Sequence, residues 1–74
     1  MEDLIKVLER VVEKEIDWTN ETALFTKGLI DSIDLAEIIS ELEDVYDIEI
    51  TMDSMVPENF NSVQAMCNMI EELQ

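Results

Sequence analysis

The sequence predicts an all-α fold, a small four-helix bundle of three longer helices and one short helix with a long first loop. The chain has 74 residues, which is enough for a single domain, residues 1–74, with a modest core. Apolar residues make up 47% of the chain, and in three segments they recur at the spacing of one helix face. Only one short segment alternates like a strand, and a strand without a partner does not form a sheet.

The first helix is expected over residues 3–15, where apolar residues occupy one arc of a helical wheel and charged residues the opposite arc. From Asp17 to Asp31 this periodicity is lost. Thr, Asn and Gly residues there supply turn chemistry around the apolar residues Trp18, Leu24 and Phe25. We therefore expect a long loop that packs over the core.

The second helix is the clearest element, and we expect it from Ser32 to Tyr46. Asp31 is a suitable N-cap, and Asp34 adds negative charge to the first turn, where the helix dipole favours it. The apolar residues of this segment follow one another at helical spacing, at Leu35, Ile38, Ile39, Leu42, Val45 and Tyr46.

The last third of the chain predicts a loop, a short helix and a longer helix. Residues 47–51 alternate with a period of two, and we interpret them as a loop that directs Ile48 and Ile50 into the core. Pro57 can open a helical turn that runs to Phe60. Ser62 can cap a final helix with apolar residues on one side, namely Val63, Met66, Cys67, Ile70 and Leu73.

Charge restricts the partners of this chain. It carries 19 acidic residues against 4 basic ones and no His, which gives a net charge of −15. Nucleic acids and anionic membranes are poor partners for such a protein, whereas basic protein surfaces are good ones.

No apolar run is long enough for membrane insertion, the single Cys excludes an internal disulfide, and the first residues lack the pattern of a secretion signal. We expect a cytoplasmic monomer.

Ser32 is the residue that could carry chemistry, because it stands at the start of the second helix. A catalytic serine needs a base and an oxyanion hole, whereas this chain has no His, and Asp31 and Asp34 would repel a developing negative charge. Catalysis by this chain alone is therefore not expected. The simplest alternative is that Ser32 helps to cap the helix.

Residues 47–58 can be compared with a calcium-binding loop, because oxygen-bearing side chains fall at the positions that would ligate the ion. The sixth position, however, holds Met52 where the sharp turn demands Gly, and Pro57 stands at the eleventh position. We expect no metal site.

Residues 28–50, GLIDSIDLAEIISELEDVYDIEI, closely resemble the modification segment of acyl carrier proteins. The family pattern is a Gly-containing loop, Asp-Ser-Leu/Ile-Asp, a spaced Glu, and Leu-Glu-x-x-Phe/Tyr-x-Ile-Glu-Ile. Residues 20–25 and 61–70 resemble the first loop and the last helix of the family, so the resemblance covers nearly the whole chain. The segment matches the pattern at Asp31, Ser32, Ile33, Asp34, Glu37, Leu42, Glu43, Tyr46, Ile48, Glu49 and Ile50.

The resemblance implies an acyl-carrier-like fold and a non-catalytic role. Ser32 would bear 4′-phosphopantetheine, transferred from coenzyme A by a separate holo-carrier synthase, a phosphopantetheinyl transferase. Its thiol would carry acyl groups as thioesters between partner enzymes. Asp31 matches a family position that helps to bind Mg²⁺ in the transferase complex. Asp31 is therefore a candidate partner-binding residue.

The pathway has two interpretations. The tract at residues 42–50 is similar to fatty-acid carriers, which favours fatty acid or related acyl-chain biosynthesis. Residues 28–30 and 56–60 depart from that pattern and are similar to aminoacyl carriers or to specialised polyketide or peptide-pathway carriers. Ser40 also departs from it, since it stands where fatty-acid carriers have an apolar residue.

The second helix also predicts a docking surface. Asp34, Glu37, Glu41 and Asp44 fall on one side of the helix as an acidic stripe without any Lys among them. Ordinary solvation is one interpretation of this stripe, and the other is docking onto basic patches of acyl-transferring or acyl-activating enzymes. Ile33 is either an exposed contact for such partners or buried under the loop. A rival from another class is an acidic helical interaction module without covalent cargo.

Overall fold

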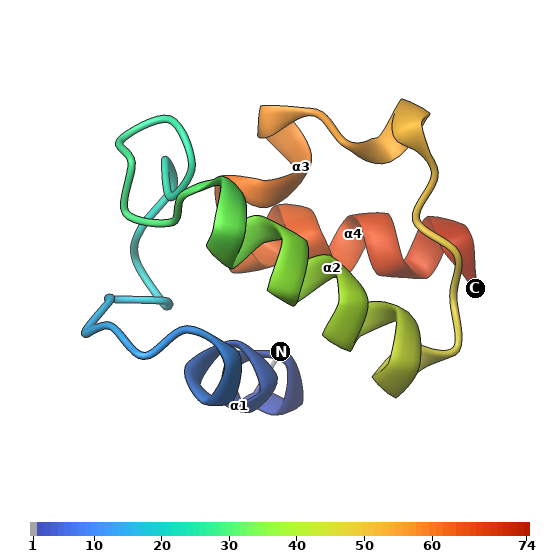
Figure 1. Cartoon of the computed structure of the whole chain (residues 1–74), viewed down its shortest axis with the longest axis horizontal. Helices are drawn as coiled ribbons and strands as arrows, with labels where there is room; N and C mark the ends of the chain where they lie inside the picture. The colour runs from blue at the N-terminus through green and yellow to red at the C-terminus, as the bar shows by residue number, and fades with distance from the viewer. Residues whose placement is uncertain (1) are drawn as a thin grey trace.

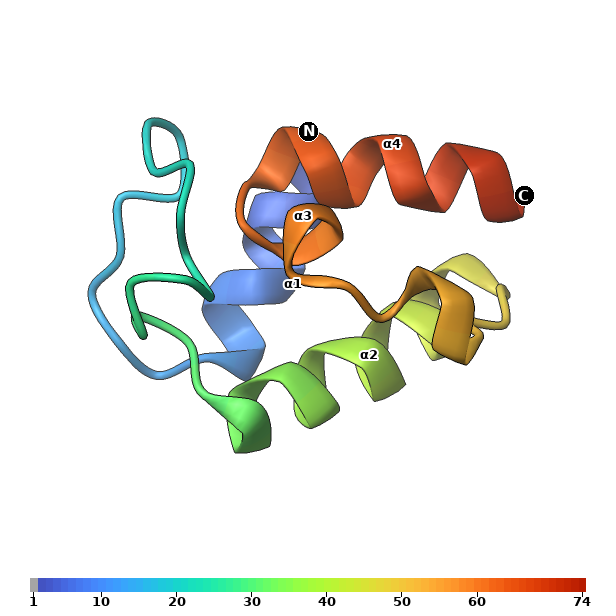
Figure 2. The same cartoon turned by 90° about the horizontal axis from the view of Figure 1, so that it is seen from above.

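The computed structural model describes residues 2–74, and all its regular elements are helices (Figures 1 and 2). No strand occurs within the described residues. This confirms the predicted all-α bundle of three longer helices and one short helix. The helices are α1 (Glu2–Val11), α2 (Ser32–Tyr46), α3 (Pro57–Phe60) and α4 (Val63–Leu73), with a 3₁₀ turn, η1 (Met52–Ser54), between α2 and α3.

The other two longer helices, α2 and α4, both pack against α1, and the short α3 packs against α4. Figure 2 shows α2 and α4 on opposite sides of the molecule, while the long loop between α1 and α2 closes one end. No helix in residues 2–74 is both long enough and apolar enough to cross a membrane.

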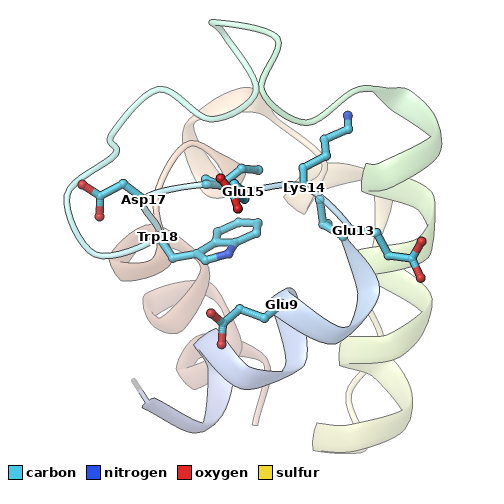
Figure 3. Close-up of a pocket in the computed structure, with 8 residues that line it drawn as sticks. Glu9, Glu13, Lys14, Glu15, Asp17 and Trp18 are labelled. Carbon is cyan, nitrogen blue, oxygen red and sulfur yellow. The ribbon is translucent and has the colours of Figure 1, made fainter.

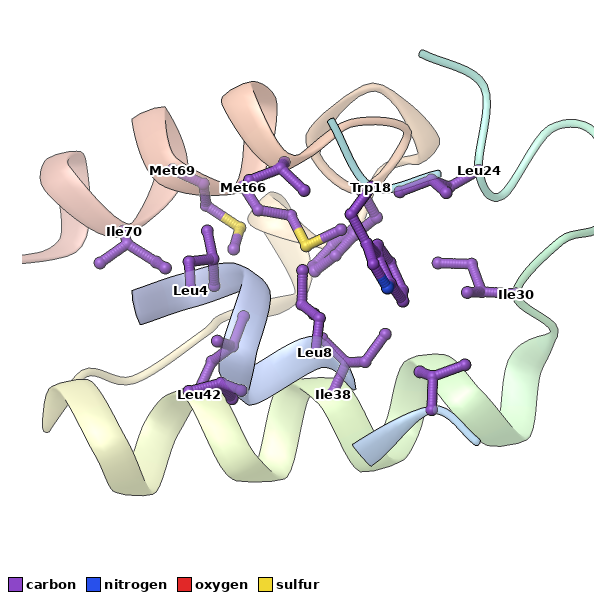
Figure 4. Packing of buried hydrophobic residues seen from close by; sticks show 14 of the residues in the cluster. Leu4, Leu8, Trp18, Leu24, Ile30, Ile38, Leu42, Met66, Met69 and Ile70 are labelled. Atoms are coloured by element: carbon purple, nitrogen blue, oxygen red, sulfur yellow. The ribbon is translucent and has the colours of Figure 1, made fainter. Parts of the chain in front are cut away.

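The core draws on every helix and on both long connections (Figure 4). Leu8, Ile38 and Met66, from α1, α2 and α4, are fully buried, and the long loop adds Trp18 and Leu24. Burial of one such side chain stabilises a fold by roughly 1.5–3 kcal/mol. No polar or charged side chain is buried within residues 2–74. The interior is therefore apolar, and the polar side chains that could bind a ligand or be modified lie at the surface.

Helix α2 has the bounds that the sequence predicts, because both of its ends are fixed locally. The Asp31 carboxylate accepts a hydrogen bond from the Asp34 N–H at 2.9 Å, and the Asp34 carboxylate accepts one from the Asp31 N–H at 3.2 Å. This reciprocal capping box satisfies two N–H groups at the start of the helix. At the other end Asp47 takes a left-handed conformation with φ 54° and donates its N–H to the Glu43 carbonyl.

The prediction for the first helix was wrong at its end, because α1 stops at Val11 and not near residue 15. Val12 is still buried, and its N–H donates to the Leu8 carbonyl at 2.8 Å. Beyond it the chain leaves the helical path. Lys14 then reaches α2 and Trp18 enters the core, and these tertiary contacts override local helix propensity.

The segment after α2 is a loop and not a strand, as expected. Ile48 and Ile50 are both buried, and the Glu43 carboxylate accepts the Ile50 N–H at 2.9 Å. The Ser62 hydroxyl caps α4 by accepting the Ala65 N–H at 3.0 Å, which also agrees with the prediction.

Candidate functional site

Ser32 is the first residue of α2 and is exposed to solvent. Its hydroxyl forms no hydrogen bond with any other group in residues 2–74, and the capping role that could have explained it is taken by Asp31. The backbone N–H groups of Ser32 and Ile33 are also free of partners in this part of the chain, as the first N–H groups of a helix usually are. The structure therefore presents a free hydroxyl next to free backbone donors.

The turn before α2 holds Ser32 in place. Gly28 adopts a positive φ of 77°, which glycine tolerates better than other residues. The next two N–H groups, of Leu29 and Ile30, both donate to the Leu24 carbonyl, at 2.9 and 3.2 Å. The Ile30 side chain is fully buried immediately before the cap. The start of α2 is thus anchored to the core on one side and free on the other.

Lys14 partly neutralises the acidic start of α2. Its ammonium lies 2.6 Å from the Asp34 carboxylate, 3.9 Å from that of Asp31 and 3.5 Å from the Leu29 carbonyl. The hydrogen bond from Lys14 is the main cause that lowers the pKa of Asp34, and the same bond raises the pKa of Lys14. Lys14 is remote from Ser32 in the sequence, and the fold brings it close to the start of α2.

The acidic stripe on α2 is divided by such pairs. Asp34 keeps only 15% of its side chain exposed, and Glu41 binds Arg10 of α1 at 3.0 Å. Glu37 and Asp44 are exposed and form no ion pair within residues 2–74. Two of the four predicted residues therefore attach α2 to other segments, Glu41 to α1 and Asp34 to the loop that follows α1, and the other two are free.

Ile33 is exposed, with 72% of its surface accessible. The sequence left open whether Ile33 is exposed or buried under the loop, and this exposure excludes burial. An exposed isoleucine beside a free serine hydroxyl gives this corner of the molecule an apolar contact point.

A shallow hollow of about 400 Å³ lies directly beside Ser32. The hollow was not predicted, although six of its residues lie on α2, each three or four positions from another of them. This spacing is the signal that could have revealed one shared face. Met55 reaches it from the far side of the η1 turn and could not be assigned from the sequence. The hollow is lined by Ser32, Leu35, Ala36, Ile39, Ser40, Glu43 and Met55.

The chemistry available at this site is limited. The hydroxyl of Ser32 has no hydrogen-bonded base among the described residues, and the chain contains no His. No group of three or more acidic or cysteine side chains in residues 2–74 could hold a metal ion. Such a site offers a serine to be modified by another protein more readily than a nucleophile of its own.

Comparison with known proteins agrees with this geometry. The sequence model of a family described as "Phosphopantetheine attachment site" matches residues 2–70. A protein named D-alanyl carrier protein from Streptococcus uberis is 27% identical over 73 residues, which cover 99% of this chain and 92% of that protein. Proteins of the same name from Streptococcus pyogenes serotypes M5 and M49 match with the same identity and coverage.

Proposed function

The chain belongs to the phosphopantetheine attachment family, and from this we infer that it is a non-catalytic carrier whose Ser32 hydroxyl receives 4′-phosphopantetheine. One observation carries the proposal, namely the exposed hydroxyl of Ser32 that takes no part in capping its helix. When attached, the group supplies a thiol at the end of a flexible arm, and this thiol holds a carboxylic acid as a thioester.

The residues around Ser32 fit a phosphodiester. The free N–H groups of Ser32 and Ile33 point out of the helix start, where the helix dipole favours an anion. Asp31 and Asp34 oppose a negative group, but the Lys14 ammonium beside both carboxylates offsets part of this charge. Within the proposed transferase complex, the exposed Asp31 carboxylate is available for Mg²⁺.

Partner enzymes are proposed to approach along α2. Glu37 and Asp44 are free to meet Lys or Arg side chains, and Ile33 supplies an apolar contact next to the modified serine. Asp34 and Glu41 contribute to the same negative field, although each is already paired with a cation of the α1 region. The first such partner is the phosphopantetheinyl transferase, and the others are enzymes that load and unload the thiol.

The cargo is proposed to be a small aminoacyl group and not a fatty acyl chain. The matched relatives are named D-alanyl carrier proteins. Most of the wall of the hollow beside Ser32 is apolar, but the hollow is shallow and open to solvent, so it would not enclose a long alkyl chain.

Residues 42–50, whose sequence is similar to fatty-acid carriers, have a structural role that does not depend on the cargo. Leu42, Ile48 and Ile50 are buried in the core, and the Glu43 carboxylate holds the Ile50 N–H. These residues end α2 and attach the following loop to the core. They are therefore expected in carriers of any cargo and do not discriminate between pathways.

Modification is tested by incubating the unmodified protein with coenzyme A, Mg²⁺ and a broad-specificity phosphopantetheinyl transferase, followed by intact mass measurement. We expect one added phosphopantetheine in the wild type and none in Ser32→Ala. Ser40→Ala is the matched control, since Ser40 is exposed on the same helix, and it should be modified normally. A folded wild type that gains no mass would favour the rival, an acidic interaction module without cargo.

The cargo is tested on protein isolated from its native cells, with Ser32→Ala as the control. Hydroxylamine cleaves the thioester and releases the cargo as a hydroxamate, which mass spectrometry identifies. An amino acid hydroxamate is the expected product. A fatty acyl hydroxamate would instead place the chain in fatty acid biosynthesis, while leaving the assignment of Ser32 intact.

A further inference from the structure

A second hollow, of about 620 Å³, lies where α1 ends and the long loop begins (Figure 3). Its lining comes entirely from residues 9–18, so it shares no residue with the hollow beside Ser32. Four acidic residues line it, Glu9, Glu13, Glu15 and Asp17, and Trp18 forms part of its wall. In Figure 3 Glu9 and Glu15 lie beside the indole ring, whereas the carboxylates of Glu13 and Asp17 point away from it.

Three of these carboxylates have no cation to balance them. The cations nearest in sequence are Lys6, Arg10 and Lys14. Lys6 forms no ion pair within residues 2–74, while Arg10 binds Glu41 at 3.0 Å and Lys14 binds Asp34 at 2.6 Å, both on α2. Figure 3 shows the Lys14 side chain directed away from the indole ring. No ion pair in residues 2–74 includes Glu9, Glu13 or Glu15. The fourth carboxylate, of Asp17, accepts hydrogen bonds from Asn20.

Trp18 gives independent reason to expect a ligand here. Its side chain is almost fully buried, with 4% of its surface exposed, yet its indole N–H has no hydrogen-bond partner in residues 2–74. A buried indole N–H usually has a partner. Every fully enclosed side-chain nitrogen or oxygen in this part of the chain is satisfied, so this N–H faces accessible space. In Figure 3 the indole nitrogen lies on the edge of the ring toward Glu9.

We propose that this hollow receives a Lys or Arg side chain of a partner protein. The carboxylates of Glu9 and Glu15, which lie beside the indole ring, face the cation, and Glu13 adds to the negative field. The Trp18 N–H donates to a backbone carbonyl oxygen of the same basic segment. A peptide carries both the cation and the acceptor, whereas a bare metal ion offers no acceptor for an N–H. The described residues also lack a cluster of metal-ligating groups.

This contact is separate from the proposed docking along α2. Ser32, Ile33 and Glu37 do not line this hollow, so a basic segment bound in it does not itself contact them. The carrier would then be retained by one protein while another acts on its arm, which raises the effective concentration of the cargo at the second protein.

The experiment uses the full chain labelled with ¹⁵N, both before and after attachment of phosphopantetheine, because the proposal does not depend on that modification. Trp18 is the only tryptophan, so a single indole N–H resonance reports on the hollow. The probe is the blocked peptide acetyl-Gly-Arg-Gly-Arg-Gly-amide, and the same peptide with Glu in place of Arg is its control. We expect the indole resonance to shift with saturation only with the Arg peptide.

Two triple variants with equal net charge separate a local site from general attraction. The variant Glu9→Gln, Glu13→Gln, Glu15→Gln should weaken peptide binding at least about tenfold, which is a loss of about 1.4 kcal/mol. The control changes three exposed carboxylates elsewhere, as Glu58→Gln, Glu71→Gln, Glu72→Gln, and should bind like the wild type. Equal weakening in both triples, or no saturable shift in the wild type, would overturn the proposal.

Discussion

Gly28 holds the turn before the candidate site in a left-handed conformation with φ 77°. A Cβ added there would meet no atom within 4 Å, so Gly28→Ala costs only the backbone strain of that conformation. We expect a loss of unfolding free energy of about 1–2 kcal/mol in urea denaturation. Gly28→Asn should lose less, because Asn tolerates this region better. An Ala variant as stable as the wild type would show that the turn can relax to negative φ.

Asp31 has two roles that substitutions can separate. It caps α2 through its carboxylate, and it is the proposed Mg²⁺ contact in the transferase complex. Asp31→Asn keeps an oxygen for the cap and should leave stability nearly unchanged, whereas Asp31→Ala should lose about 1 kcal/mol of unfolding free energy. Both variants should gain phosphopantetheine more slowly in a timed mass assay. An Asn variant that is modified at the wild-type rate would limit Asp31 to capping.

The ion pair between Lys14, which follows α1, and Asp34, in the first turn of α2, makes stability depend on pH. The pKa of Asp34 is lowered from its ordinary 3.8 and that of Lys14 is raised from 10.5, chiefly by their mutual hydrogen bond. A lowered carboxyl pKa gives stability that is present above 3.8 and is lost as pH falls through the folded-state value. A raised ammonium pKa gives stability that is present below 10.5 and is lost as pH rises through the folded-state value.

The test is Asp34→Asn, which removes the charge and keeps an oxygen for the Asp31 N–H. The wild type should be more stable than this variant at pH 7, and the difference should shrink below pH 3.8. Urea unfolding at a series of pH values measures it. Lys14→Gln should lose stability over the same pH range. A difference that does not change with pH would show that the ion pair contributes nothing to stability.

The ion pair of Lys14 and Asp34 also shows which features of the fold could not be predicted from the sequence. The bounds of α2 follow from neighbours in sequence, because Asp31 and Asp34 are three residues apart and cap each other. Lys14 and Asp34 are 20 residues apart, and no periodicity reports such a pair. The early end of α1 was missed for the same reason, since tertiary contacts that begin with Lys14 decide it. Ser32 is a candidate from the sequence because the motif that resembles acyl carrier proteins is contiguous around it.

The net charge of −15 acts on the entire fold. The molecule measures 28 × 22 × 20 Å, so in about 10 mM salt, where the Debye length is roughly 30 Å, nearly all its charges interact with one another. Four ion-pair contacts oppose this repulsion within residues 2–74. Repulsion therefore dominates the electrostatic free energy.

Added salt should stabilise the protein. Raising NaCl from about 10 mM to about 500 mM screens more repulsive pairs than attractive ones, and we expect the melting temperature to rise by several degrees. Circular dichroism at 222 nm during heating measures this change. KCl at the same ionic strength should act equally, because screening does not depend on the cation. A melting temperature that falls with salt would mean that the ion pairs outweigh the repulsion.

The capping box at the start of α2 also has a geometric consequence. Since it fixes the first turn, a group attached at Ser32 would leave the protein from a fixed point on α2. An enzyme that grips the exposed side of α2 would thereby also hold the origin of a flexible tether at a set distance from its own catalytic entrance. Recognition of the carrier and delivery of its cargo become one geometric event, and different enzymes can share it without a separate address for each cargo.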